Sequence, residues 1–85
     1  MAEVIVSFRV MPKDTSVDLD VLEKKIKEAI QPQRISRQPV AFGIVAFYVI
    51  KLVPDAEGVL QQTEDRLRKI QEVGEVEVTG MTRSL

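Results

Sequence analysis

The chain has 85 residues, 12 basic and 13 acidic side chains, and a formal net charge of −1. It contains no cysteine and no histidine, which excludes disulfides, thiolate nucleophiles, imidazole bases and the usual zinc sites. The balanced charge also argues against nucleic acid as the main partner, because binding that depends on phosphate contacts needs a basic excess.

The length predicts one small domain over residues 1–85. No apolar run approaches the roughly 18 residues that a membrane span needs. The N-terminal residues MAEVIVSF lack the basic flank of a signal peptide. We therefore expect a cytoplasmic protein without a membrane partner.

The first half of the sequence predicts a strand, a helix and a short edge strand. Apolar and polar residues alternate over residues 3–11, as in a half-buried strand. Apolar residues then recur at helical spacing over residues 19–30, after Asp18 as a helix N-cap. Residues 34–38 are short and polar and end at Pro39, which is typical of an edge strand.

The second half predicts a central strand, a second helix and a last strand. Residues 44–53 are apolar except for Lys51, as in a strand that is covered on both faces. Helical spacing returns over residues 60–70, and residues 75–79 alternate again. The tail, residues 80–85, looks too short to form a further element.

The order strand, helix, strand, strand, helix, strand is that of a ferredoxin-like α+β sandwich. Right-handed crossovers would place both helices on one face of a four-stranded antiparallel sheet, with the first and third strands at its centre. The expected core comprises Val4, Val6, Phe8, Leu22, Ile26, Phe47, Val49, Leu67 and Val78. The open face would carry Ile5, Ile44, Ala46, Tyr48 and Ile50. This open face is apolar enough to join two copies of the chain as a homo-oligomer.

One local pattern suggests an RNA-recognition module. Residues 40–47, VAFGIVAF, parallel the RNP1 motif, with Phe42 and Ile44 on the third strand at the positions of base-stacking aromatics. The sequence departs from that motif at Val40, where a basic residue is expected, and at Ile44, which is not aromatic. Single-stranded RNA binding is therefore an alternative function for which we expect weak affinity.

A dimeric, ligand-binding regulatory domain is a second alternative. The apolar open face, with Ile44, Tyr48 and Ile50, would provide its dimer interface. The sequence has no glycine-rich phosphate loop and no convergent polar set that would indicate a ligand, a cofactor or a metal. The acidic pairs Glu64 with Asp65 and Glu75 with Glu77 look like solvated faces.

A broader resemblance covers essentially the whole chain. The chain resembles the translation elongation factor 1-beta family in its archaeal form, which is similar to the C-terminal nucleotide-exchange domain of the eukaryotic factor. The most specific feature is a proline followed three residues later by an aromatic residue, glycine and isoleucine. The residues that carry the resemblance are Val10-Met11-Pro12, Asp18-Leu19, Leu22-Glu23, PVAFGI at 39–44, Asp55 and GMTRSL at 80–85.

This resemblance implies a guanine-nucleotide exchange factor for the GTPase elongation factor 1-alpha, without covalent chemistry or a cofactor of its own. In the family, an aromatic residue wedges against the GTPase and a lysine near the C-terminus points at its magnesium site. Phe42, followed by Gly43, matches the aromatic residue, and Arg83 matches the lysine, unless the tail alignment shifts by one residue and places Ser84 there. Because a planar guanidinium imitates a compact cation poorly, we expect the aromatic wedge to carry more of the effect.

We expect Phe42 and Arg83 to lie near one end of the sheet and together to form the exchange site. The topology opposes this, because the third and fourth strands both run antiparallel to the first. Phe42 precedes the third strand and Arg83 follows the fourth, so the tail must fold back or the site consists of two separated contacts. The alternative roles are structural: Phe42 would cap the open end of the core, and Arg83 would be an ordinary solvated residue.

Overall fold

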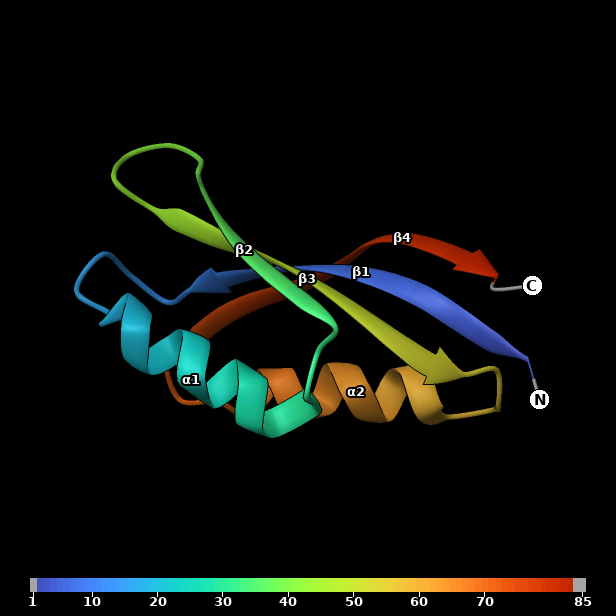
Figure 1. The fold of residues 1–85 in the computed structure, drawn as a ribbon. Coiled ribbons are helices and arrows are strands. Elements are labelled where there is room, and N and C mark those ends of the chain that lie inside the picture. Colours follow the sequence, from blue (N-terminus) through green and yellow to red (C-terminus); the bar gives the residue numbers. More distant parts are fainter. Residues whose placement is uncertain (1, 84–85) are drawn as a thin grey trace.

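The computed structural model describes residues 2–83 and contains four strands and two helices. Strands β1 and β3 lie at the centre of a sheet with the order β2-β3-β1-β4, and all neighbouring strands are antiparallel. Both helices lie against the same face of this sheet (Figure 1). The ferredoxin-like α+β arrangement is thus confirmed. The elements are β1 (Glu3–Pro12), α1 (Leu19–Ile30), β2 (Arg34–Pro39), β3 (Val45–Pro54), α2 (Val59–Arg68) and β4 (Val73–Arg83).

Helix α1 has the bounds that its sequence predicts, because both of its ends are capped. The carboxylate of Asp18 accepts hydrogen bonds from the backbone N–H groups of Asp20 and Val21, at 3.0 and 3.2 Å. At the other end, Gln31 takes a left-handed conformation and its N–H donates to the carbonyl of Lys27. Neither α1 nor α2 is long and apolar enough to cross a membrane.

The core lies between the central strands and the two helices. Phe8 and Phe47 are its largest fully buried side chains. All the predicted core residues are buried except Val78, which is partly buried and packs against the others. The buried hydrophobic residues facing the helices are Val4, Val6, Phe8, Val10, Leu22, Ile26, Ile30, Phe47, Val49, Val53, Leu67 and Val76.

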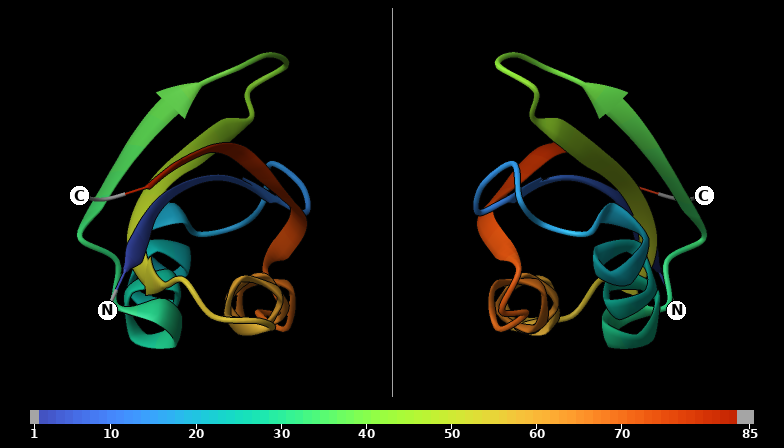
Figure 2. Two further views of the ribbon diagram at one scale, coloured as in Figure 1. Left: turned by 90° about the vertical axis from the view of Figure 1, so that its right-hand side faces the viewer. Right: turned by 90° about the vertical axis from the view of Figure 1, so that its left-hand side faces the viewer.

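The opposite face of the sheet carries no described helix (Figure 2). Tyr48 and Ile50 are half-buried there, and Ala46 is fully buried. An ion pair between Arg9 and Glu77, 3.5 Å apart, crosses from β1 to β4 on this face, so it is less uniformly apolar than the sequence predicts. Its use as an interface between two copies stays a prediction.

Strand β4 is more than twice as long as predicted, and the expectation of an unstructured tail after Thr79 is wrong. The strand runs for 11 residues and continues to pair with β1 as far as Arg83, opposite Val4. A register shift between Ser7 and Phe8 leaves Thr79 as an extra residue on β4, which is a β-bulge. The extension satisfies backbone groups in the first half of β1 that would otherwise lack partners on that side.

Candidate functional site

The loop of residues 40–44 joins β2 to β3 and projects beyond the sheet and the helices (Figures 1 and 2). The N–H of Ile44 donates to the carbonyl of Ala41 at 3.0 Å, which closes a four-residue turn. A second hydrogen bond joins the N–H of Val40 to the carbonyl of Ile44 at 2.9 Å. The central residues of the turn, Phe42 and Gly43, have φ values of 55° and 76°. Positive φ at both central positions is the signature of a type I′ hairpin turn.

Phe42 stands at the tip of this turn with 96% of its surface exposed. The structural alternative, in which its ring caps the core, is therefore wrong. The placement of Phe42 and Ile44 on the third strand is also wrong, because β3 begins only at Val45. A left-handed conformation costs a bulky L-residue roughly 1–2 kcal/mol. Since the ring buries almost nothing, folding does not explain why a phenylalanine occupies this position.

Gly43 is required by its backbone conformation rather than by crowding. A Cβ atom at Gly43 would lie 3.8 Å from Cγ2 of Thr15, which is an ordinary van der Waals contact. The loop between β1 and α1 therefore lies beside the hairpin tip. This neighbouring loop is itself held by Asp14, whose carboxylate accepts hydrogen bonds from the hydroxyl and N–H of Ser16. These hydrogen bonds lower the pKa of Asp14.

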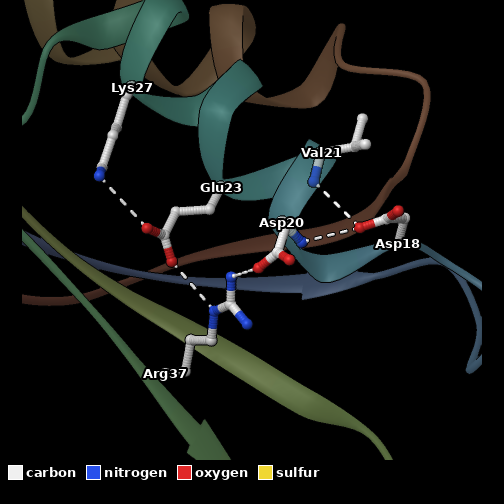
Figure 3. Close-up of polar contacts among 6 residues, drawn as sticks. All are labelled: Asp18, Asp20, Val21, Glu23, Lys27 and Arg37. Carbon is white, nitrogen blue, oxygen red and sulfur yellow. Dashed lines mark hydrogen bonds and ion pairs between the residues drawn. The ribbon is translucent and has the colours of Figure 1, made fainter.

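The hairpin is tied to helix α1 by Arg37 of β2 (Figure 3). Its Nη2 lies 2.6 Å from a carboxylate oxygen of Asp20, and its Nε donates to Glu23 at 3.0 Å. Lys27 contacts the other oxygen of Glu23 at 3.2 Å. Partial burial opposes the ionisation of Glu23, but the hydrogen bonds from Arg37 and Lys27 outweigh it and lower the pKa of Glu23. The guanidinium carbon also lies 5.4 Å from the ring centroid of Phe47.

Arg83 is the last residue of β4, where it has one ion-pair partner. Its guanidinium forms an ion pair with the carboxylate of Asp55, at the end of β3. The N–H of Asp55 in turn donates to the carbonyl of Ala2 at 3.0 Å. The side chain of Arg83 nevertheless remains 73% exposed. Ser84, the alternative match in the tail, lies outside the described residues.

The structure does not bring Phe42 and Arg83 together, so the expectation that they share one end of the sheet is wrong. Arg83 pairs with Val4 at one end of β1, while Phe47 pairs with Val10 near the other end. These six positions along β1 correspond to about 20 Å at 3.3 Å per residue. Phe42 lies farther out still, beyond the start of β3. The hairpin tip and the end of β4 are therefore two separate surfaces.

Three of the four residues in the predicted acidic pairs lie near basic side chains. Glu64 and Asp65 lie 2.9 and 3.8 Å from Arg68 on α2, and Glu77 pairs with Arg9. Within residues 2–83, the structure contains no group of three or more acidic side chains that could hold a metal ion. The sequence did not reveal the contacts of Arg37, because its partners lie 14 and 17 residues away on another element.

Comparison with known proteins assigns the chain to a family. A family model described as the EF-1 guanine nucleotide exchange domain matches residues 5–83. Elongation factor 1-beta of Methanothermobacter thermautotrophicus is 39% identical over 87 residues, which span 98% of both chains. The protein of the same name from Archaeoglobus fulgidus is 35% identical, over 95% of this chain and 97% of its own. The one from Thermococcus gammatolerans is 38% identical, over 88% of both chains. The chain, with its ferredoxin-like sheet and exposed hairpin tip, therefore belongs to the family of EF-1 guanine nucleotide exchange domains.

Proposed function

We propose that this protein promotes the release of GDP from elongation factor 1-alpha, with Phe42 as its main contact and Arg83 as a separate second contact. The observation that carries this proposal is the exposure of Phe42, an aromatic ring held at the tip of a strained turn. A bulky residue in an unfavourable conformation that contributes no burial suggests a function in binding. Family membership supports the same function and the same partner.

Exchange of this kind needs no catalytic group in the exchange factor. GDP is held by its GTPase largely through the phosphates and a bound Mg²⁺, so a partner that disturbs the phosphate loop or the cation weakens GDP without touching its base. The factor must bind the nucleotide-free GTPase more tightly than the GDP-bound form, because equal affinity would shift nothing. The protein therefore acts by binding alone, without covalent chemistry and without a cofactor.

The turn presents Phe42 in a form suited to binding. The two hydrogen bonds within residues 40–44 fix the backbone around the ring before any partner arrives. A side chain that is already oriented loses less conformational entropy on binding than a flexible one. Val40, which is 41% exposed, extends the apolar surface of the tip. A ring of this size can fill an apolar pocket on the GTPase and displace the elements around it.

Arg83 supplies a cation at the other end of the sheet. The side chain of Arg83 is largely exposed and that of Asp55 is 34% exposed, and ion pairs with such access to solvent add little stability, so a partner can replace Asp55 at low cost. The planar guanidinium matches carboxylates and phosphates better than it imitates a magnesium ion. Arg83 therefore contacts an anionic group of the GTPase, and Phe42 carries the larger part of the effect.

We assign this activity to residues 1–85, acting as a single domain in the cytoplasm. Its partner is the GTPase, and neither a membrane nor a nucleic acid takes part. The exposed position of Phe42 leaves the ring free for a protein pocket, away from a stacking platform on the sheet surface. Homo-oligomerisation through the open face is not needed for this function.

The direct test measures the release of labelled GDP from elongation factor 1-alpha in excess unlabelled nucleotide, with and without the protein. Phe42→Ala should slow the stimulated release by about tenfold or more, as for a binding hot spot. Removal of residues 83–85 should slow it by a smaller factor. Both variants should melt close to the wild-type temperature, since Phe42 and Arg83 are exposed and the truncation removes only the last residue of β4. Full exchange activity in both variants would overturn the proposed site.

An RNA-binding assay at two salt concentrations tests the main alternative. We expect weak binding that falls as salt rises, as for contacts governed by charge alone. Submicromolar affinity for single-stranded RNA in near-physiological salt, lost on Phe42→Ala, would instead assign the ring to base stacking.

A further inference from the structure

Strand β2 carries one side of the hairpin tip but is itself poorly anchored. It lies at the edge of the sheet and pairs only with β3. Five of its six residues are exposed, and the sixth, Ile35, is only half-buried. Burial therefore anchors the hairpin through its other arm, β3, where Ala46 and Phe47 are buried, and does little to fix the β2 arm. The β2 arm needs another source of orientation if Phe42 is to be held toward a pocket on a partner.

The contacts of Arg37 provide such a source. The guanidinium uses Nε and Nη2 to reach two carboxylates on α1, Glu23 and Asp20 (Figure 3). A planar group held at two points fixes direction as well as distance. Lys27 holds the carboxylate of Glu23 from the other side, and the ring of Phe47 lies beneath the guanidinium. Arg37 thus joins an edge strand to the first half of a helix that is firmly packed in the core.

We infer that Arg37 is a positioning residue for Phe42, holding the β2-β3 hairpin at a fixed angle to α1. This inference rests on the proposed function of Phe42. Phe42 lies five residues beyond Arg37, a lever of about 16 Å in extended chain. A rotation of the hairpin by about 10° at Arg37 would move the ring by about 3 Å over that lever. Such a displacement is large compared with the fit that a buried aromatic contact requires.

The small expected effect of Arg37 on stability distinguishes a positioning role from a structural one. Arg37 is partly exposed, with 36% of its side chain accessible, and exposed ion pairs contribute little to stability. Breaking the network should therefore change the direction and mobility of the hairpin more than the melting temperature.

The first experiment breaks the network from both sides. Arg37→Gln removes the cation, and the double variant Asp20→Asn/Glu23→Gln removes its partners without touching the hairpin. Each should slow stimulated GDP release by about threefold to tenfold, less than the loss of a complete hot-spot side chain. Arg37→Lys should recover only part of the rate, because an ammonium reproduces one contact but not the fork.

Arg68→Gln is the matched control. Arg68 also pairs with two carboxylates, Glu64 and Asp65, but all three lie on α2 and none belongs to the hairpin. Its loss should leave GDP release unchanged. If Arg68→Gln slows release as much as Arg37→Gln does, the effect comes from surface charge in general and the inference fails.

A double-mutant cycle with Phe42→Ala tests whether Arg37 acts through Phe42. If it does, Arg37→Gln has no further effect once the ring is gone. Additive effects would instead mean that Arg37 contacts the GTPase directly, which overturns a positioning role. If Phe42→Ala slows exchange but Arg37→Gln does not, only this inference fails. Normal exchange by Phe42→Ala itself would overturn the proposed function together with the inference.

A readout independent of activity uses Phe42→Trp, because the chain contains no native tryptophan. The fast component of the time-resolved fluorescence anisotropy then reports local motion at the hairpin tip, and the slow component reports the tumbling of the whole protein. Adding Arg37→Gln should increase the fast component of the decay, whereas adding Arg68→Gln should leave it unchanged. Identical decays with and without Arg37 would overturn the inference, whatever the exchange rates.

Discussion

Replacing Phe42 with asparagine should make the protein more stable and less active. The ring is 96% exposed, so its removal forfeits almost no buried area. The remaining effect on stability comes from the backbone, where Phe42 has a φ of 55° and is followed by Gly43 at 76°. Asn-Gly is a preferred pair for type I′ turns, because asparagine tolerates the left-handed region. Of the roughly 1–2 kcal/mol of strain at this position, we expect Phe42→Asn to recover about 1 kcal/mol.

The expected gain is measurable by thermal unfolding. For a domain of 60–100 residues, 1 kcal/mol corresponds to a rise in Tm of about 4–8 °C. The same sample, used in the GDP-release assay, should show the loss of stimulated exchange that Phe42→Ala shows. Phe42→Ala is the matched control, because alanine keeps the Cβ atom and its strain. It should lose exchange without the rise in Tm.

Two outcomes would refute this reasoning. A Tm at or below the wild-type value in Phe42→Asn would mean that the turn stores no strain at this residue. A higher Tm together with wild-type exchange would mean that the strain exists but does not serve the exchange reaction. The expected combination is a trade-off between stability and activity, which commonly marks residues selected for function.

Three further predictions concern the core, a close backbone contact and an ion pair. Phe47→Ala removes a fully buried ring, so urea unfolding should show a loss of about 3–5 kcal/mol, and a near-neutral effect would contradict its place in the core. Gly74→Ala would place a Cβ atom 2.7 Å from the Cα of Lys13; the forced shift should cost about 1–3 kcal/mol, and unchanged stability would show that the contact relaxes freely. The hydrogen bond from Lys25 lowers the pKa of Glu72 in the folded protein. The ionised Glu72 should therefore stabilise the fold fully above its unfolded pKa of about 4.3, and this contribution should disappear as the pH falls through its lower pKa in the folded state. Glu72→Gln should therefore flatten the acid side of the stability-pH profile, and an identical acid side in both proteins would contradict this.

The elements that could be predicted from the sequence are those with local signals. The bounds of α1 follow from Asp18 as its cap and from apolar residues at helical spacing, and both signals lie within the segment itself. The alternation in β1 and the apolar run of β3 likewise identified the two central strands. The element order then led to the sheet order, because few topologies satisfy right-handed crossovers.

The features that could not be predicted depend on pairing between distant residues. The alternation in β4 breaks at the Thr79 bulge, so the sequence predicts an end of the strand there, although pairing with β1 continues to Arg83. The exposure of Phe42 agrees with the contact that the family resemblance implies, but the left-handed turn that holds the ring could not be predicted from the apolar residues around it. The partners of Arg37 follow only from the packing of β2 beside α1, and no local pattern encodes that contact.

If Phe42 and Arg83 are the two contacts that we propose, their separation offers the selectivity that an exchange factor needs. A single contact that is equally accessible in every state of a GTPase cannot favour the nucleotide-free state. Two contacts on one hydrogen-bonded sheet, more than about 20 Å apart along β1, engage together only when their binding sites on the partner have the matching spacing. Once one contact has formed, the second can form within the same complex if the GTPase is in the state with matching spacing. In the other states of the GTPase the second contact does not form. The differential affinity then depends on how firmly the sheet and the hairpin hold that spacing, which is why the orientation of an exposed edge strand can affect exchange without much effect on stability.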